Sequence, residues 1–292
     1  MNRRLQRAQQ LLRRSGLLER ADRVRFVWSR LRTSWDNARF SREYPSFSLP
    51  PPRLAFGAYS APAWRFYKES GEDTARFIAA TLHRHLDEVR TGAVLEWGCG
   101  PARVVRHLPP LLGSSTRVCG SDYDPDTVEW CREHIEGVEF VLNDLLPPLS
   151  LDTDSFDCAY SISVLTHLSR ESGQAWSREL ARVVRPGGLV IVSTCGASRL
   201  PYLLPEERHA FEVDGIVVRG DVREGGKMFG AFHHPRFVRE HLLGGLDILE
   251  HAPAGFPHLD QDLWVARRPP AAGSAAKPTG NPSPPISPLQ TL

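Results

Sequence analysis

The stretch VLEWGCGPARVV, residues 94–105, decides the fold class of this chain. It begins with a short apolar run, which is typical of a buried strand, and apolar spacing resumes after Arg103. Between these two parts lie Glu96, Gly98 and Gly100. Glycine has no Cβ atom, so the backbone can turn sharply here and approach a ligand closely. A loop of this kind at the carboxyl end of a buried strand predicts a ligand site.

Strand-like and helix-like segments alternate on both sides of this loop. Residues 72–89 have helical periodicity, with Ala75, Ile78, Leu82 and Leu86 on one face. Strands are expected at residues 93–97, 117–122, 138–144, 156–163 and 189–195, and helices at 102–112, 125–135 and 178–185. The alternation predicts an α/β fold with a Rossmann-like, doubly wound, mostly parallel sheet and helices on both faces. Closer-spaced strand candidates at 215–220, 228–232, 246–251 and 262–266 predict an antiparallel edge at the C-terminal side or an inserted cap.

The chain divides into three parts by composition. Residues 1–45 hold twelve arginines against four acidic residues, and the first 33 or so predict a basic amphipathic helix. That helix could lie on a membrane surface, contact a partner, act as a transit-like presequence, or simply pack on the domain or fray. Residues 46–268 form the expected domain, which opens with an ordered but irregular connection over 46–66. The Pro-rich residues 269–292 are expected to be disordered.

Charge and cysteine usage exclude several classes of protein. The net charge is +2, and the strongly basic first part leaves the middle of the chain acidic, which argues against a nucleic-acid partner. No apolar run approaches the roughly 18 residues of a membrane span. The five widely spaced cysteines predict reduced core thiols in a cytoplasmic protein. The pairs His83 with His85 and Cys131 with His134 supply only two ligands each, so no metal site is expected.

The glycine loop does not fit a dinucleotide. The fingerprint for such ligands requires a third small residue where this chain has Arg103, and Glu96 would repel a pyrophosphate. Asp122 follows the second strand, where an acid can accept hydrogen bonds from ribose hydroxyls. Asp144 follows the third strand, where an acid can accept from the exocyclic amine of a nucleobase. Together these residues predict a nucleoside with a cationic amino-acid arm, S-adenosyl-L-methionine.

From about residue 71 to residue 266 the chain resembles the class I S-adenosylmethionine-dependent methyltransferases. VLEWGCGPARVVRHL is similar to the first motif of that family, and ELARVVRPGGLVIVST to the helix and turn ahead of its fifth strand. The family usually has a third glycine where this chain has Ala102. The resemblance places Tyr123 in the ribose-binding turn GSDYDP, and it implies that adenine is held by Asp144, Asn143 or the backbone of Leu145.

A methyl transfer from a sulfonium mainly requires alignment of the acceptor, and a base only where the acceptor is a poorly acidic hydroxyl. Ser161, Ser163 and His167 follow the fourth strand and are expected on the methyl side of the crevice. His167 is the first candidate for the base, with a structural histidine as the alternative. His233 and His234 follow the fifth strand and are further candidates, with an exposed loop pair as the alternative.

The resemblance suggests a small-molecule or glycan acceptor. No aromatic NPPY-type motif follows the fourth strand, where the chain reads SISV, and this favours an oxygen acceptor over an amino group. Two other classes stay open. One is a scaffold or interaction protein that binds the cofactor without turnover, and the other is a nicotinamide-dependent oxidoreductase, which Arg103 and Glu96 disfavour.

Overall fold

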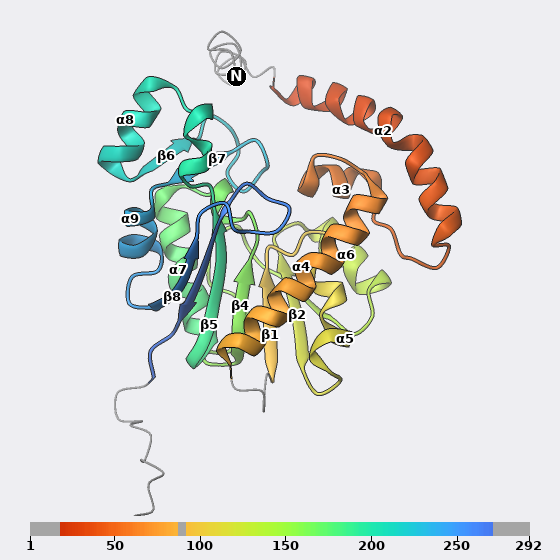
Figure 1. The fold of residues 1–292 in the computed structure, drawn as a ribbon. Coiled ribbons are helices and arrows are strands. Elements are labelled where there is room, and N and C mark those ends of the chain that lie inside the picture. Colours follow the sequence, from red (N-terminus) through yellow and green to blue (C-terminus); the bar gives the residue numbers. More distant parts are fainter. Residues whose placement is uncertain (1–17, 87–91, 271–292) are drawn as a thin grey trace, which may run out of the picture.

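The computed structural model describes residues 18–86 and 92–270, and its centre is a seven-stranded sheet (Figure 1). The strand order is β3-β2-β1-β4-β5-β9-β8. The first five strands run parallel, and β9 pairs antiparallel with both β5 and β8. The strands are β1 (Ala93–Trp97), β2 (Arg117–Asp122), β3 (Glu139–Leu142), β4 (Phe156–Ser161), β5 (Val184–Thr194), β8 (Asp247–Ala252) and β9 (Asp262–Arg267). The predicted Rossmann-like sheet with an antiparallel C-terminal edge is confirmed.

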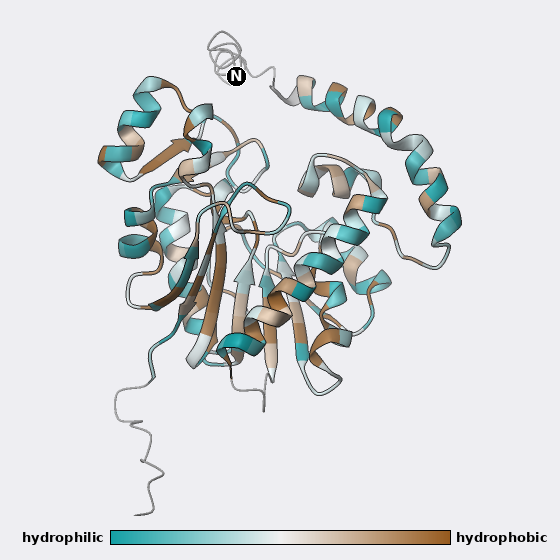
Figure 2. Cartoon of the chain, in the orientation of Figure 1, coloured by the Kyte–Doolittle hydropathy of each residue, from teal (hydrophilic) through white to brown (hydrophobic). Residues whose placement is uncertain are grey.

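Helices cover both faces of the sheet because successive strand residues point to opposite sides. Val94 belongs to the core cluster that contains Ile78 of α4 (Trp64–His85) and Val128 of α6 (Pro125–His134). The next residue, Leu95, belongs to the cluster on the other face, which contains residues of α7 (Arg170–Val183) and α9 (Pro235–Phe237). Figure 2 shows the hydrophobic strands enclosed between these helices. The site loops therefore extend from a rigid, two-sided core.

The prediction of a helix at residues 102–112 is wrong. The chain forms turns as far as Val104, a 3-10 turn over Val105–His107 and the short helix α5 (Pro109–Leu112). Two features prevent a longer helix. Ala102 has a left-handed backbone with φ of 56°, and Pro109 and Pro110 lack the N–H groups that an α-helix uses.

The expectation of an irregular connection at residues 46–66 is also wrong in part. Residues Pro52–Tyr59 form helix α3, whose proline stands in the first turn, where a missing N–H does no harm. Helix α4 then begins at Trp64, eight residues before the predicted start. The proline-rich stretch therefore opens a helix and not a loop.

The N-terminal basic segment contains helix α2 (Leu18–Glu43), which is longer at its C-terminal end than the sequence predicted. Residues 1–17 of the predicted helix, and the predicted disordered tail from residue 271, lie outside the described residues. Figure 1 places α2 at the periphery, beside α3 and away from the sheet. None of the described helices is long and apolar enough to span a bilayer.

The closely spaced strand candidates fall into two groups. The last two form the sheet edge as β8 and β9, whereas β6 (Ile216–Arg219) and β7 (Gly230–His233) make a separate two-stranded sheet. Helix α8 (Pro205–Asp214) packs against this hairpin through Phe211 and Val217. The edge and the inserted element predicted as alternatives are therefore both present.

Candidate functional site

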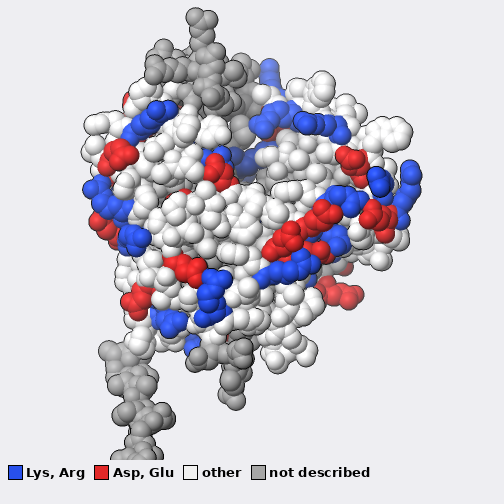
Figure 3. Space-filling view, viewed as in Figure 1, with Lys and Arg blue, Asp and Glu red and all other residues white. Residues whose placement is uncertain are grey.

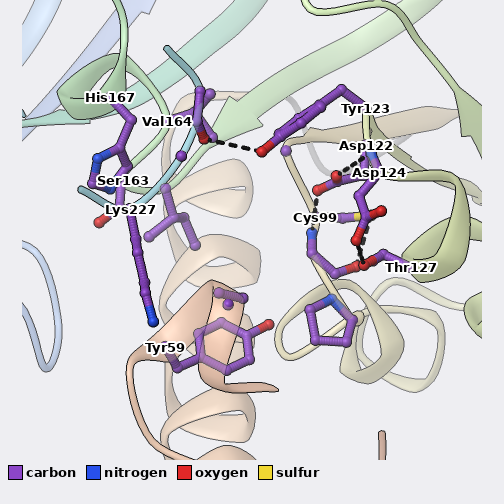
Figure 4. A pocket seen from close by; sticks show the side chains of 18 of the residues that line it. Tyr59, Cys99, Asp122, Tyr123, Asp124, Thr127, Ser163, Val164, His167 and Lys227 are labelled. Carbon is purple, nitrogen blue, oxygen red and sulfur yellow. Dashed lines mark hydrogen bonds between the residues drawn. The ribbon is translucent and has the colours of Figure 1, made fainter. Parts of the chain in front are cut away.

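A cavity of about 890 Å³ lies at the carboxyl ends of β1, β2 and β4 (Figure 4). Its floor is the loop after β1, and its sides are the ends of β2 and β3 and the turn after β4. Helix α3 and the segment between β6 and β7 supply the remaining walls, and Asp22 of α2 reaches it as well. Segments that are far apart in the sequence therefore meet around one space.

The glycine loop adopts a backbone that side chains would not tolerate. Gly98 and Gly100 have φ of 72° and 51°, in the left-handed region. A Cβ atom on Gly98 would lie 2.2 Å from Cγ2 of Val164. The N–H groups of Gly98 and Cys99 donate to the Ser121 carbonyl at 2.8 and 2.9 Å, so the end of β2 fixes the start of the loop. These hydrogen bonds thus hold the loop in this conformation without a ligand.

Asp122, at the end of β2, ties the loop to the neighbouring helix. Its Oδ2 accepts from the Gly100 N–H at 2.8 Å and its Oδ1 from the Asp124 N–H at 3.0 Å. The side chain is 8% exposed, and burial raises its pKa above the ordinary value of an aspartate. Tyr123 stands beside it and donates to the Gly225 carbonyl at 3.3 Å, as Figure 4 shows. Both predicted ribose-side residues line the cavity.

Glu96 lies beneath the loop and also lines the cavity. It is 3% exposed, and its Oε2 accepts a hydrogen bond from the Tyr160 hydroxyl at 2.9 Å. Burial raises the pKa of Glu96 to about 8, although Tyr160 and the Arg103 guanidinium act in the opposite direction. The carboxyl is therefore held neutral near pH 7, and a cation in the cavity would favour its ionised form.

The three residues predicted to hold adenine also line the cavity. The Nδ2 of Asn143 donates to the Asp144 carbonyl at 2.7 Å, while its Oδ1 is buried with no partner among the described residues. The Asp144 side chain is exposed. The Leu145 carbonyl accepts from Nε1 of Trp176 at 2.9 Å. Of the buried groups among these residues, the Asn143 carboxamide oxygen is the acceptor that the described part of the chain leaves unused.

His167 lies across the cavity from Asp122, on the side where Lys227 stands (Figure 4). Its Nδ1 is 2.7 Å from the Phe229 carbonyl, a contact that requires a proton on Nδ1 and leaves Nε2 as an acceptor. Burial lowers the pKa of His167, so the ring is neutral near pH 7. This is the arrangement that a general base needs.

The turn after β4 is held by a small polar network. Gln261 donates to Ser163 Oγ at 2.7 Å and accepts from Ser193 Oγ at 2.7 Å. Ser163 lines the cavity, whereas Ser161 is 1% exposed within the sheet and does not. The structure therefore does not bring the predicted Ser161 to the cavity and places Ser163 there.

The structure does not bring His233 and His234 to the cavity either. His233 is 3% exposed in β7 and stacks on Phe237, and burial lowers its pKa to about 3. Nδ1 of His234 accepts from the Arg236 N–H at 3.1 Å, as a cap of α9. Both rings therefore pack within the β6–β7 and α9 region instead of forming a cap over the acceptor.

Sequence reasoning missed many residues of the cavity wall, and three of them carry polar groups that bear on the chemistry of the site. The Tyr59 hydroxyl and Nε of Arg103 are buried without a partner in the described part of the chain, and both residues line the cavity. Lys227 pairs with Asp22 at 3.0 Å and lies 3.3 Å from the centre of the Phe56 ring. Tyr59 and Lys227 come from α3 and the β6–β7 segment, where no sequence motif marks them. Arg103 was visible only as a departure from a glycine pattern.

Residues 94–188 match the family model described as a methyltransferase domain. The match runs from β1 into β5 and so includes the glycine loop, Asp122, Asn143 and His167.

Two curated proteins are similar over parts of their length. An uncharacterized 37.1 kDa protein from a transposon of Streptomyces fradiae is 34% identical over 123 residues, 41% of this chain and 35% of that protein. The malonyl-[acyl-carrier protein] O-methyltransferase of Yersinia pestis is 30% identical over 158 residues, 53% of this chain and 57% of that enzyme. The chain thus matches about a third of the first relative and just over half of the second.

Among solved structures, an S-adenosylmethionine-dependent methyltransferase of Methanosarcina mazei aligns with a TM-score of 0.49 at 18% identity. The alignment covers 65% of this chain and 97% of that one.

Proposed function

We propose that this chain, which carries a class I S-adenosylmethionine-dependent methyltransferase domain, transfers a methyl group to an oxygen atom of a small-molecule or glycan acceptor. The observation that carries the proposal is the set of buried polar atoms in the cavity that the fold leaves without partners. Within the part of the chain that the structure describes, they are the Tyr59 hydroxyl, the Arg103 Nε, the Asn143 Oδ1 and the Asp22 Oδ1. An unpaired buried polar group is costly, so a ligand that satisfies such groups is strongly favoured.

The residues present fit each part of the cofactor. Arg103 and the Tyr59 hydroxyl can donate to a carboxylate, while Glu96 can ionise against an ammonium group. On the far side of the glycine loop, Asp122 can accept from ribose hydroxyls and Asn143 Oδ1 from an adenine amine. Gly98 lets the loop pass close to Val164, because a Cβ at Gly98 would lie 2.2 Å from the Val164 side chain.

When bound, S-adenosylmethionine supplies an electrophilic methyl group. The protein contributes alignment of the acceptor and exclusion of water, which together can account for most of the acceleration. His167 contributes a base: the Phe229 carbonyl holds the proton on Nδ1, and Nε2 is free to take a proton from an acceptor hydroxyl. The lowered pKa keeps His167 in the neutral form that this step needs.

Two observations support an oxygen acceptor. His167 offers a neutral base, which a hydroxyl of high pKa needs and an already nucleophilic amine does not. The Yersinia relative is by its name an O-methyltransferase whose acceptor is a malonyl group on a carrier protein. Because this chain matches 57% of that enzyme, the acceptor itself does not carry over with the likeness.

The test has two parts. Calorimetry of the purified protein with S-adenosylhomocysteine and with NAD should show binding of the first alone. Binding of NAD alone would overturn the proposal in favour of an oxidoreductase. Turnover of a labelled methyl donor is then measured against matched acceptors with a carboxyl, a phenolic hydroxyl, a sugar hydroxyl or an amine. Methylation only of the amine would overturn the oxygen assignment, and cofactor binding without any turnover would favour the scaffold.

A further inference from the structure

Helix α2 has one face that packs against the domain. The less exposed residues of the helix recur three or four residues apart and are Asp22, Phe26, Ser29, Thr33, Asn37 and Phe40. Phe26 packs on Phe56 of α3 with the ring centres 5.1 Å apart, and Phe40 is fully buried. Asn37 donates to the Pro62 carbonyl at 2.6 Å. The orientation of α2 about its own axis is therefore fixed.

The opposite face carries a row of exposed apolar side chains, here called the outer stripe. It consists of Val24, Val27, Trp28, Leu31 and Trp35. Their spacing places them on one side of the helix, and their exposed fractions are 59%, 55%, 71%, 67% and 86%. Contiguous exposed apolar surface of this kind marks an interaction site in soluble proteins.

Arginines flank the outer stripe. The seven arginines of α2 are all exposed, and none forms an ion pair within the described ranges 18–86 and 92–270. The acids of α2 are partly neutralised, because Asp22 pairs with Lys227 and Glu43 with Arg65. In Figure 3 blue side chains alternate with white ones along the upper right edge, where Figure 1 places α2. The free charge beside the stripe is thus mainly positive.

We propose that α2 binds the surface of an anionic membrane, with the outer stripe among the lipid headgroups and its arginines on the lipid phosphates. Tryptophan favours the membrane interface because its indole has both an apolar body and an N–H donor. Exposed arginines complement the negative surface of acidic lipids, and each basic residue near such a surface strengthens binding severalfold. Residues 1–17 add five arginines and no acid to the same end of the chain.

The orientation of α2 gives this binding a consequence for the cavity. Asp22, on the packed face, lines the cavity, while the outer stripe faces the opposite way. A helix with side chains is about 10–12 Å across. Docking therefore holds the cavity roughly one helix diameter from the lipid surface.

The test uses the full chain and unilamellar vesicles of phosphatidylcholine, with or without about 30% phosphatidylglycerol. Five of the seven tryptophans are at most 7% exposed, so only Trp28 and Trp35 can change environment on docking. We expect a blue shift of tryptophan emission, quenching by lipids brominated in the acyl chain, and cosedimentation with acidic vesicles. Binding should weaken about tenfold or more without the acidic lipid and should fall as salt rises.

Two sets of variants test the contributions of the outer stripe and of the arginines separately. Trp28→Ser with Trp35→Ser should lower vesicle affinity about tenfold or more, whereas Val213→Ser, which removes an exposed apolar side chain on α8, should leave it unchanged. Arg32→Glu with Arg39→Glu should abolish the preference for acidic vesicles, and Arg178→Glu on α7 should not. All variants should bind S-adenosylhomocysteine as the unchanged chain does, since none of these residues lines the cavity.

Two outcomes would overturn the proposal. One is absence of binding to both kinds of vesicle, or equal binding by the double tryptophan variant. The other is a dimer in sedimentation equilibrium that the double tryptophan variant loses, because a second copy of the chain would then cover the stripe. Neither outcome bears on methyl transfer, which the cofactor titration and the turnover assay test separately.

Discussion

Glu96 is the residue whose charge the fold controls most directly at the site. Its folded-state pKa of about 8 lies above that of an unfolded chain, which is about 4.3. Between these values the unfolded state has lost a proton that the folded state keeps. The free energy of unfolding therefore falls as pH rises from the unfolded-state pKa of Glu96 to its folded-state pKa. Above the folded-state pKa, Glu96 causes no further loss of stability.

We expect Glu96→Gln to remove this dependence. Histidines, whose ordinary pKa is about 6.5, titrate alike in the two proteins, so the difference between wild type and variant from about pH 6.5 to 8 isolates the carboxyl. Across it, urea unfolding should show the wild-type protein losing stability relative to the variant by up to about 1.4 kcal/mol per pH unit. Parallel curves for the two proteins would mean that Glu96 is already ionised in the folded state.

His167 is the proposed base, and its removal should affect turnover more than binding. His167→Ala should lower kcat by about 10²–10⁴-fold while the affinity for S-adenosylhomocysteine stays nearly unchanged. Because burial lowers the pKa of His167, the wild-type rate should rise with pH below about 6.5 and be level above it. His233→Ala, which alters a histidine outside the cavity, is the matched control. A flat pH profile with full activity in His167→Ala would end the base assignment.

Tyr59 is proposed to bind the carboxylate of the cofactor, and two ligands can isolate that contact. Tyr59→Phe removes only the hydroxyl, and it should weaken binding of S-adenosylhomocysteine by about 1.5–3 kcal/mol, the range for hydrogen bonds to charged groups. Methylthioadenosine, which lacks the amino-acid arm, should bind both proteins equally in calorimetry. An equal loss for both ligands would show that Tyr59 only shapes the glycine loop, whose Gly100 lies beside its hydroxyl.

At the scale of elements, the glycine loop joins β1 to the rest of the site and leaves no room for a side chain. Gly98→Ala combines an unfavourable φ of 72° with a contact to Val164, so cofactor binding should fall below detection. Gly113→Ala has a similar φ of 88° but meets no atom within 4 Å, and it should reduce stability by about 1 kcal/mol without altering binding. Adding Val164→Ala to Gly98→Ala should restore part of the binding. Full binding by Gly98→Ala alone would contradict this account.

The bounds of β1 and β2 could be predicted to the residue because each strand has an apolar centre and is followed by a recognisable break, Gly98 after β1 and the helix start at Pro125 after β2. The bounds of the helices near prolines could not be predicted. Prolines stand in the first turn of both α3 and α5, and Pro109 and Pro110 also prevent one helix from running through residues 102–112. The residues on the glycine loop and at strand ends were predictable, since their positions follow from the sheet. Tyr59 and Lys227 were not, since no local pattern says that α3 and the β6–β7 segment close over the loop.

At the scale of the whole molecule, an ion pair at the cavity joins the N-terminal helix α2 to the segment between β6 and β7. Lys227, between β6 and β7, pairs with Asp22 of α2 at 3.0 Å and donates to the Phe56 carbonyl at 3.1 Å. Burial lowers the pKa of Lys227, and Asp22 acts in the opposite direction. The side chains of Asp22 and Lys227 are 23% and 15% exposed, so solvent screens the pair less than a surface ion pair. The pair therefore reports whether α2 unfolds together with the domain.

A double-mutant cycle with Asp22→Asn and Lys227→Met measures that coupling. If α2 unfolds with the domain, the coupling in the free energy of unfolding should be about 1 kcal/mol. The same cycle on Asp73 and Arg76, an exposed pair on α4, should give a value near zero, because its partners are 53% and 59% exposed. If α2 detaches before the domain unfolds, both states in the transition lack the contact, and the coupling vanishes from global unfolding. In that case the coupling would appear only in hydrogen exchange of α2 amides, and residues 18–43 would form a separate unit whose release opens one wall of the cavity.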